Sequence, residues 1–174
     1  LDPRFVEVQT AKDTAFVRSL DALLHACRVD QGALALVVVR WVDNPMELGS
    51  GGGTRDGEKP YRPSDLLDAM DVSMEANCIH GFRTDSGDVA LVYRDVDRGE
   101  IAQGVRDGFA KLREAMLEER GMASQAPIPW IAGIALVSGP SRSFQSDQLV
   151  DAAWRCLESA SVHGTASIKS IEVF

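Results

Sequence analysis

The sequence has little of the features that mark membrane, disulfide-rich or nucleic-acid-binding proteins. Its longest apolar run, Ala33–Val39, has seven residues, whereas a membrane-spanning helix needs about 20. Three cysteines in 174 residues, with no C-x-x-C pair, argue against a disulfide framework. Lys and Arg number 18 against 26 Asp and Glu, a formal net charge of −8. Because such a chain repels phosphates, its composition argues against general binding to nucleic acid or to an anionic membrane.

The cysteines and the start of the chain point to a reducing compartment. Cys27, Cys78 and Cys156 each fall on the apolar side of a predicted helix, which indicates buried thiols. The chain begins at Leu1 with no basic segment followed by an apolar one, so no signal peptide is predicted. We therefore expect a cytoplasmic location, with these residues forming part of a longer polypeptide.

Helical and strand periodicities alternate along the chain. In order, the expected elements are helix Thr10–Val29, strand Ala33–Val42, a helix from Pro63, strands Ile79–Arg83 and Asp88–Arg94, helix Asp97–Arg120, strand Pro129–Val137, helix Ser146–His163 and strand Ser167–Phe174. This order predicts an α/β (α+β) fold with a palm-like βαββαβ core. The helices would flank one mixed sheet of about five strands.

A glycine-rich stretch separates the first strand from the next helix. Residues 44–62 include the run Gly49–Gly53 and predict a flexible loop. The glycines are similar to those of a phosphate-binding loop, but Glu58 stands where that motif needs lysine. With this loop included, residues 1–174 are expected to form a single domain.

The histidines and two of the tryptophans are interpreted as structural residues rather than as parts of a binding site. His25, His80 and His163 lie far apart and share no metal-ligand spacing. Trp130 and Trp154 fall in or beside predicted core elements, so we interpret them as packing residues. The sequence thus predicts neither a zinc site nor an aromatic stacking platform.

The order of elements and several short stretches resemble the GGDEF domain of diguanylate cyclases. Gly32–Val39 is similar to that family's first strand, and Asp65-x-Leu67 to its Gly-Asp-x-Leu-Leu helix start. Arg83–Val92 is similar to its Arg-x-Gly-Gly-Asp-Glu-Phe hairpin, and Ile131–Ala135 to its Ser-x-Gly-x-Ala strand. Residues 146–174 resemble its terminal helix and strand. The resemblance spans nearly the whole chain and implies the fold of that family.

The sequence departs from the family at the residues that hold metal ions. The family joins two GTP molecules with two cations, which are bound by carboxylates of the first strand and the hairpin turn. The strand aspartate aligns here with Arg40, or with Trp41 in an alternative alignment, and neither side chain binds Mg²⁺. The turn reads Asp85, Ser86, Gly87, Asp88 and Val89 in place of Gly-Gly-Asp-Glu-Phe. Asp88 is a shortened substitute for the glutamate.

Two further positions also differ from the family pattern. The basic phosphate-binding residue of the terminal helix falls near Ser161, and the Arg-x-x-Asp of the inhibitory site falls near Ala76–Ile79. From these departures we predict a degenerate domain that is not an enzyme. It would have no catalytic residue, no metal ion and no cofactor.

The residues left at the former active site suggest two roles. Arg40, Asp65, Arg83, Asp85 and Asp88 form a candidate ligand or ion-pair cluster. In one hypothesis, Arg40 pairs with Asp85 or Asp88 and fills the metal site. In the other, Arg40 is a solvated arginine at a strand end.

The resemblance implies a function in cyclic di-GMP-type signalling. We expect a catalytically inactive regulatory domain that acts through protein-protein contacts. Its partner would be another protein, a neighbouring EAL-type or sensor domain, or a second copy in a homodimer, and neither nucleic acid nor a membrane. The alternative is a non-catalytic sensor that binds GTP or cyclic di-GMP through Arg40, Arg83 and the glycine-rich loop.

Overall fold

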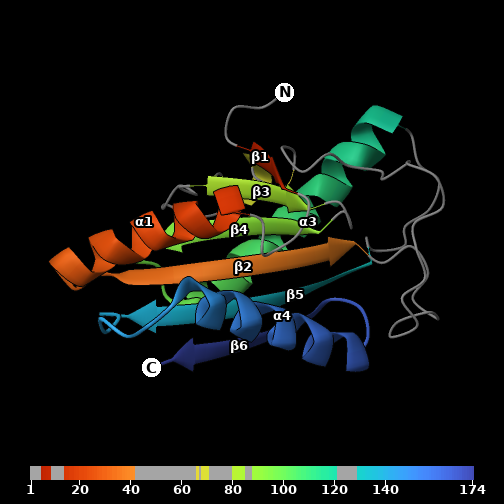
Figure 1. Cartoon of the computed structure of the whole chain (residues 1–174). Coiled ribbons are helices and arrows are strands. Elements are labelled where there is room, and N and C mark those ends of the chain that lie inside the picture. The colour runs from red at the N-terminus through yellow and green to blue at the C-terminus, as the bar shows by residue number, and fades with distance from the viewer. Residues whose placement is uncertain are drawn as a thin grey trace.

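The computed structural model in Figure 1 describes residues 5–8, 14–41, 66, 68–70, 80–84, 88–120 and 129–174. Its elements are β1 (Phe5–Val8), α1 (Thr14–Asp30), β2 (Ala33–Trp41), β3 (His80–Thr84), β4 (Val89–Arg94), α3 (Arg98–Arg120), β5 (Trp130–Ser138), α4 (Ser146–Val162) and β6 (Ser167–Val173). Leu66 and residues 68–70 are also helical, within the helix predicted from Pro63. The predicted loop 44–62 and Cys78 lie outside the described residues.

The strands form one mixed sheet in the order β1-β3-β4-β2-β5-β6. The pairs β3–β4, β4–β2 and β2–β5 are antiparallel, and β1–β3 and β5–β6 are parallel. The predicted fold class is therefore confirmed. The sheet has six strands rather than about five, because β1 adds to the edge beside β3.

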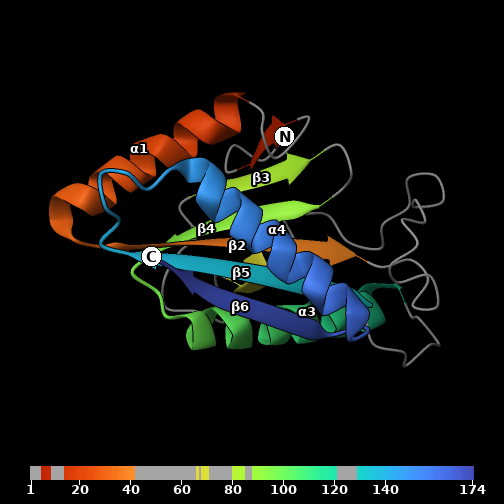
Figure 2. The ribbon, with the colours of Figure 1, turned by 60° about the horizontal axis from the view of Figure 1, so that its bottom comes forward.

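Strand β2 lies inside the sheet and is covered on both faces. Its residues from Leu34 to Val39 are at most 1% exposed, which explains the uninterrupted apolar run in the sequence. Helices α1 and α4 pack on one face of the sheet and α3 packs on the other (Figure 2). Within the described residues, no helix is both long enough and apolar enough to cross a membrane.

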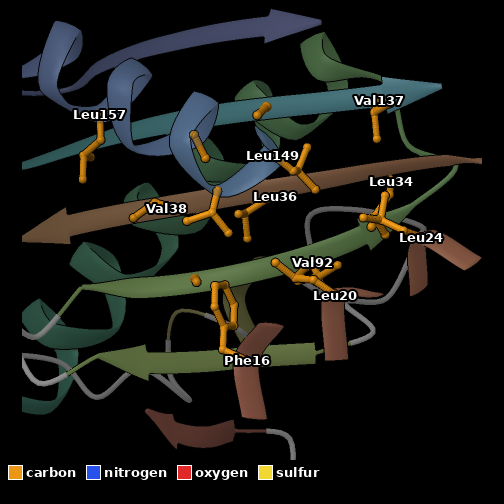
Figure 3. Packing of buried hydrophobic residues seen from close by; sticks show 14 of the residues in the cluster. Phe16, Leu20, Leu24, Leu34, Leu36, Val38, Val92, Val137, Leu149 and Leu157 are labelled. Carbon is orange, nitrogen blue, oxygen red and sulfur yellow. The ribbon is translucent and has the colours of Figure 1, made fainter. Parts of the chain in front are cut away.

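The α1/α4 side of the core is mainly aliphatic (Figure 3). Because residues of a helix that are four apart share one face, α1 presents Phe16, Leu20 and Leu24 to the sheet. Helix α4 adds Leu149 and Leu157 above β2 and β5. On the opposite side, the rings of Phe109 and Trp130 stack with their centroids 4.8 Å apart. Trp130 is 5% exposed, as expected for a packing residue.

Helix α4 lies directly against the backbone of β5 at Gly133. A Cβ atom built on Gly133 would lie 2.4 Å from the carbonyl oxygen of Ala153 and 2.4 Å from the backbone nitrogen of Leu157. A glycine in the interior of a strand often marks such a close approach of another backbone. Gly133 therefore sets how closely α4 packs on the sheet.

At the opposite end of β2 from Arg40, a polar cluster joins α1 to β4. The Asp30 carboxylate accepts hydrogen bonds from the backbone N–H of Gly32, at 2.9 Å, and from the Arg94 guanidinium. The Asp95 carboxylate accepts one from the N–H of Ala33, at 2.8 Å. These contacts satisfy backbone donors at the turn between α1 and β2 and link the turn to the end of β4.

The Asp30–Arg94 contact predicts a pH-dependent stability. The hydrogen bond from Arg94 lowers the pKa of Asp30 below its ordinary value of 3.8. The folded state therefore favours the ionised carboxylate. Its contribution is present above the pKa of the unfolded chain and is lost as the pH falls through the lower pKa of the folded state.

We therefore expect Asp30→Asn to lower the free energy of unfolding at neutral pH. The difference from the wild type should shrink as the pH falls below about 4. Urea unfolding from pH 7 to pH 3 measures it, with Asp21→Asn, at an exposed position of α1, as the matched control. A difference that stays constant over this range would contradict the prediction.

Candidate functional site

The register of β2 against β4 brings Arg40 beside Asp88. The two strands are antiparallel, and their ladder ends with Val39 opposite Val89. One step further, Arg40 lies opposite Asp88, the residue immediately before β4. Opposed residues of antiparallel strands carry their side chains on the same face. Both side chains accordingly lie on the α1/α4 side of the sheet.

Arg40 and Asp88 form a two-pronged ion pair. Nε of Arg40 donates to Oδ1 of Asp88 at 3.0 Å, and Nη2 donates to Oδ2 at 3.1 Å. The Asp88 side chain is 3% exposed, whereas that of Arg40 is 34% exposed. The hydrogen bond to Asp88 raises the pKa of Arg40, so the guanidinium stays charged. Such parallel hydrogen bonds fix the orientation of both groups.

The remaining nitrogen of the guanidinium faces helix α4. Nη1 of Arg40 lies 3.5 Å from Oε1 of Glu158, whose side chain is 64% exposed. The contact is long, and one of its partners is in solvent, so it is weaker than the pair with Asp88. Arg40 therefore connects the start of β4 to the outer surface of α4.

The other predicted site residues are placed as follows. The backbone of Arg83 lies on β3, opposite Val89 of β4 and Glu7 of β1. Val89 is 3% exposed and belongs to the core on the α3 side. Ser161 is buried in α4, where its hydroxyl donates to the carbonyl of Glu158 at 2.6 Å. Asp65, Asp85, Ser86, Gly87 and the segment Ala76–Ile79 lie outside the described residues.

The donor set at the end of β2 does not fit a divalent cation. Both oxygens of Asp88 accept hydrogen bonds from Arg40, and the guanidinium places a fixed positive charge where a cation would need oxygen ligands. Within the ranges that the structure describes, no three His, Cys, Asp or Glu side chains come together in a way that could hold a metal ion.

An open hollow of about 470 Å³ lies on the outer face of α4, next to this pair. The described residues that line it are Asp151, Trp154, Arg155 and Glu158. Glu158 therefore belongs both to the hollow and to the contact with Arg40. Trp154, interpreted from the sequence as a packing residue, is partly buried against the core and also faces the hollow.

Sequence reasoning missed Glu158. Nothing in the pattern Leu157-Glu158-Ser159 distinguishes it from other exposed acids of a helix. The spacing predicts that Leu157 and Ala160 face inward, but it does not specify which strand end they cover. That requires knowing where α4 crosses β5. Gly133 is the signal that could have shown it, since it marks the point at which the helix backbone approaches the strand.

Comparison with known proteins finds likeness in structure alone. No protein-family model and no curated protein matches the chain. The GGDEF domain of DgcB from Caulobacter crescentus, in complex with c-di-GMP, has a TM-score of 0.64 at 14% identity, over 90% of this chain and 88% of that one. The active GGEEF domain of a diguanylate cyclase from Vibrio cholerae has a TM-score of 0.58 at 12% identity. The match covers 88% of this chain and 92% of that one.

A third structure of the same kind is a complex of two proteins. The diguanylate cyclase SiaD from Pseudomonas aeruginosa, bound to its activator SiaC, has a TM-score of 0.59 at 11% identity, over 90% of this chain and 57% of SiaD. The chain therefore has the fold of GGDEF domains, which confirms the fold that the sequence resemblance implied.

The prediction that the chain is not an enzyme is wrong. It rested on departures from the family pattern at the metal-binding, phosphate-binding and inhibitory-site positions, whereas the solved domains that share the fold include the active GGEEF domain of a diguanylate cyclase. A fold can keep its architecture while its site residues vary. Departures inferred at single positions of the sequence are therefore too narrow a basis for excluding catalysis.

Proposed function

We propose that residues 1–174 form a regulatory domain of cyclic di-GMP signalling that acts through contacts with another protein or with a second copy of itself. The single observation that carries the proposal is the Arg40–Asp88 pair. The sheet and its helices are built as in GGDEF domains, while Asp88 is held by a guanidinium at 3.0 and 3.1 Å. A chain that keeps the scaffold and changes this position fits a role exerted through its surface.

The solved structures support this proposal by analogy. SiaD is described in complex with its activator, SiaC, so a protein containing a domain of this fold can receive a signal through protein contact. DgcB is described in complex with c-di-GMP, which supports a role for this chain in that signalling chemistry.

The test is association measured with and without nucleotide. Sedimentation velocity of the purified domain over a range of concentrations should show self-association that GTP, cyclic di-GMP and Mg²⁺ leave unchanged. A domain that stays monomeric at every concentration would limit the proposal to contacts with another protein. Association that requires a nucleotide would overturn the proposal.

A second candidate function, a sensor of GTP or cyclic di-GMP, is favoured by the exposure of Arg40. The pair with Asp88 engages two of the three guanidinium nitrogens and leaves the third near exposed Glu158. A phosphate could therefore reach this nitrogen without breaking the pair. Isothermal titration distinguishes the two functions, because a Kd below about 10 µM, or about −7 kcal/mol, would favour the sensor.

A further inference from the structure

The outer face of α4 combines an aromatic side chain with charged groups in one stripe. Asp151, Trp154, Arg155 and Glu158 line the hollow, and their spacing of three, four and seven residues places them on the same side of the helix. On the other side of α4, Ala153, Leu157 and Ala160 are buried against the sheet. The stripe is therefore presented on a helix that the core holds in place.

Trp154 is built as an anchor within this stripe. One part of its side chain packs against the core on the α1/α4 side, and the remainder faces the hollow. A tryptophan held in this way loses little rotamer freedom when a partner covers it. Tryptophan is also enriched among the residues that dominate protein interfaces.

The charges around Trp154 favour a basic occupant. Among the described residues, the carboxylates of Asp151 and Glu158 flank it along the helix, together with the guanidinium of Arg155. The other arginine near Glu158, Arg40, has its charge balanced by Asp88. The whole chain carries a formal charge of −8, so a basic partner is also steered toward this protein before contact. A nucleotide phosphate would meet two carboxylates, which makes it the less suitable occupant.

We propose that the hollow lined by Asp151, Trp154, Arg155 and Glu158 docks a basic amphipathic segment of a partner protein. The segment would lay an apolar side chain over Trp154 and a cation against Glu158. The inference rests on the proposed function, since it names the surface through which the protein contact is made.

The same docking would affect Arg40. A cation that approaches Glu158 competes with Nη1 of Arg40, whose contact there is 3.5 Å long. The hydrogen bonds to Asp88 engage different nitrogens of the guanidinium, at 3.0 and 3.1 Å, so they can persist. Binding in the hollow would thus change the contacts of Arg40 at the end of β2, because the Glu158 carboxylate takes part in both.

The test uses a helical peptide built of leucine, lysine and arginine. Its control is the same peptide with every lysine and arginine replaced by glutamate. Binding is followed by isothermal titration and by the indole N–H resonance of Trp154, assigned with Trp154→Phe. The basic peptide should bind, should shift the Trp154 resonance and should weaken as salt rises, because the attraction is screened. The acidic peptide should not bind.

Variants locate the binding. Trp154→Ala should weaken the basic peptide about tenfold, as expected for an interface anchor, and Glu158→Gln about threefold, as expected for a rim charge. Glu114→Gln makes the same charge change at an exposed position of α3, on the opposite face of the sheet, and should change the affinity less than about twofold. Circular dichroism confirms that each variant is folded, and Trp154→Phe should retain most of the binding.

Several results would overturn the inference: no binding of the basic peptide, equal binding of the acidic one, or equal weakening by Glu114→Gln and Glu158→Gln. Displacement of the peptide by GTP would assign the hollow to a nucleotide instead. If the domain still associates when Trp154 is replaced by alanine, this surface is not the contact, but the proposed function is unaffected. Association that requires a nucleotide would instead contradict the proposed function itself.

Discussion

Gly133→Ala should destabilise the domain by about 3 kcal/mol or prevent its folding. The added methyl group would lie 2.4 Å from two backbone atoms of α4, the carbonyl oxygen of Ala153 and the nitrogen of Leu157. Neither atom can rotate away as a side chain can, so the whole helix must move off β5. That movement would loosen the contacts of Leu149 and Leu157 with the sheet.

Urea unfolding followed by circular dichroism measures this effect, and Gly99→Ala is the matched control. Gly99 is an exposed residue in the first turn of α3, and its new methyl group would meet only the side-chain oxygen of Asp97, at 3.1 Å. Alanine there should be neutral or stabilising by up to about 1 kcal/mol, because glycine costs helix entropy. A stabilising effect of Gly133→Ala would show that α4 does not approach β5 so closely.

Arg40→Ala should destabilise the domain by about 2–3 kcal/mol. It removes a two-pronged cation from the Asp88 carboxylate, which is 3% exposed. Breaking a fully buried pair costs about 3–5 kcal/mol, and we expect less here because the Arg40 side chain is 34% exposed and water screens the interaction. Arg40→Lys should recover only part of the loss, since an ammonium cannot make two parallel hydrogen bonds.

A double-mutant cycle isolates the interaction of Arg40 with Asp88. The single variants Arg40→Ala and Asp88→Ala and the double variant should give a coupling energy of about 1–3 kcal/mol. Arg18→Ala, which removes the same charge from an exposed position of α1, should change stability by less than about 0.5 kcal/mol. Additive effects of the two single variants would mean that the pair contributes nothing to folding.

The central part of the fold was predictable because each element carries a strong local signal. The apolar run of β2 and the stripes of α1, α3 and α4 fall within a few residues of their predicted bounds. Strand β1 was missed because Phe5–Val8 is too short for its alternation to stand out. Its place depends on the parallel pairing of Phe5 with Gly81, which connects positions far apart in the chain.

At the candidate site, sequence reasoning identified the residues of the strands better than those of the helix. Arg40 and Asp88 were both predicted members, because the family resemblance placed a strand end beside a hairpin turn. The contact of Glu158 with Arg40 depends on how α4 crosses the sheet, and only three-dimensional packing determines that. The hollow around Trp154 was not predicted for the same reason, since a partly buried tryptophan and a core tryptophan have the same local pattern.

The position of β2 in the sheet also determines when the domain can fold. β2 needs β4 on one side, where Leu34 meets Arg94, and β5 on the other, where Ala33 meets Ser138. Both neighbours are synthesised later, so the most apolar strand leaves the ribosome long before its partners. Until β5 emerges, Ala33–Val39 is a β-prone segment without its cover and open to aggregation. The domain should therefore complete its folding only after the ribosome has released most of the chain, and slowly, because its pairings are distant in sequence.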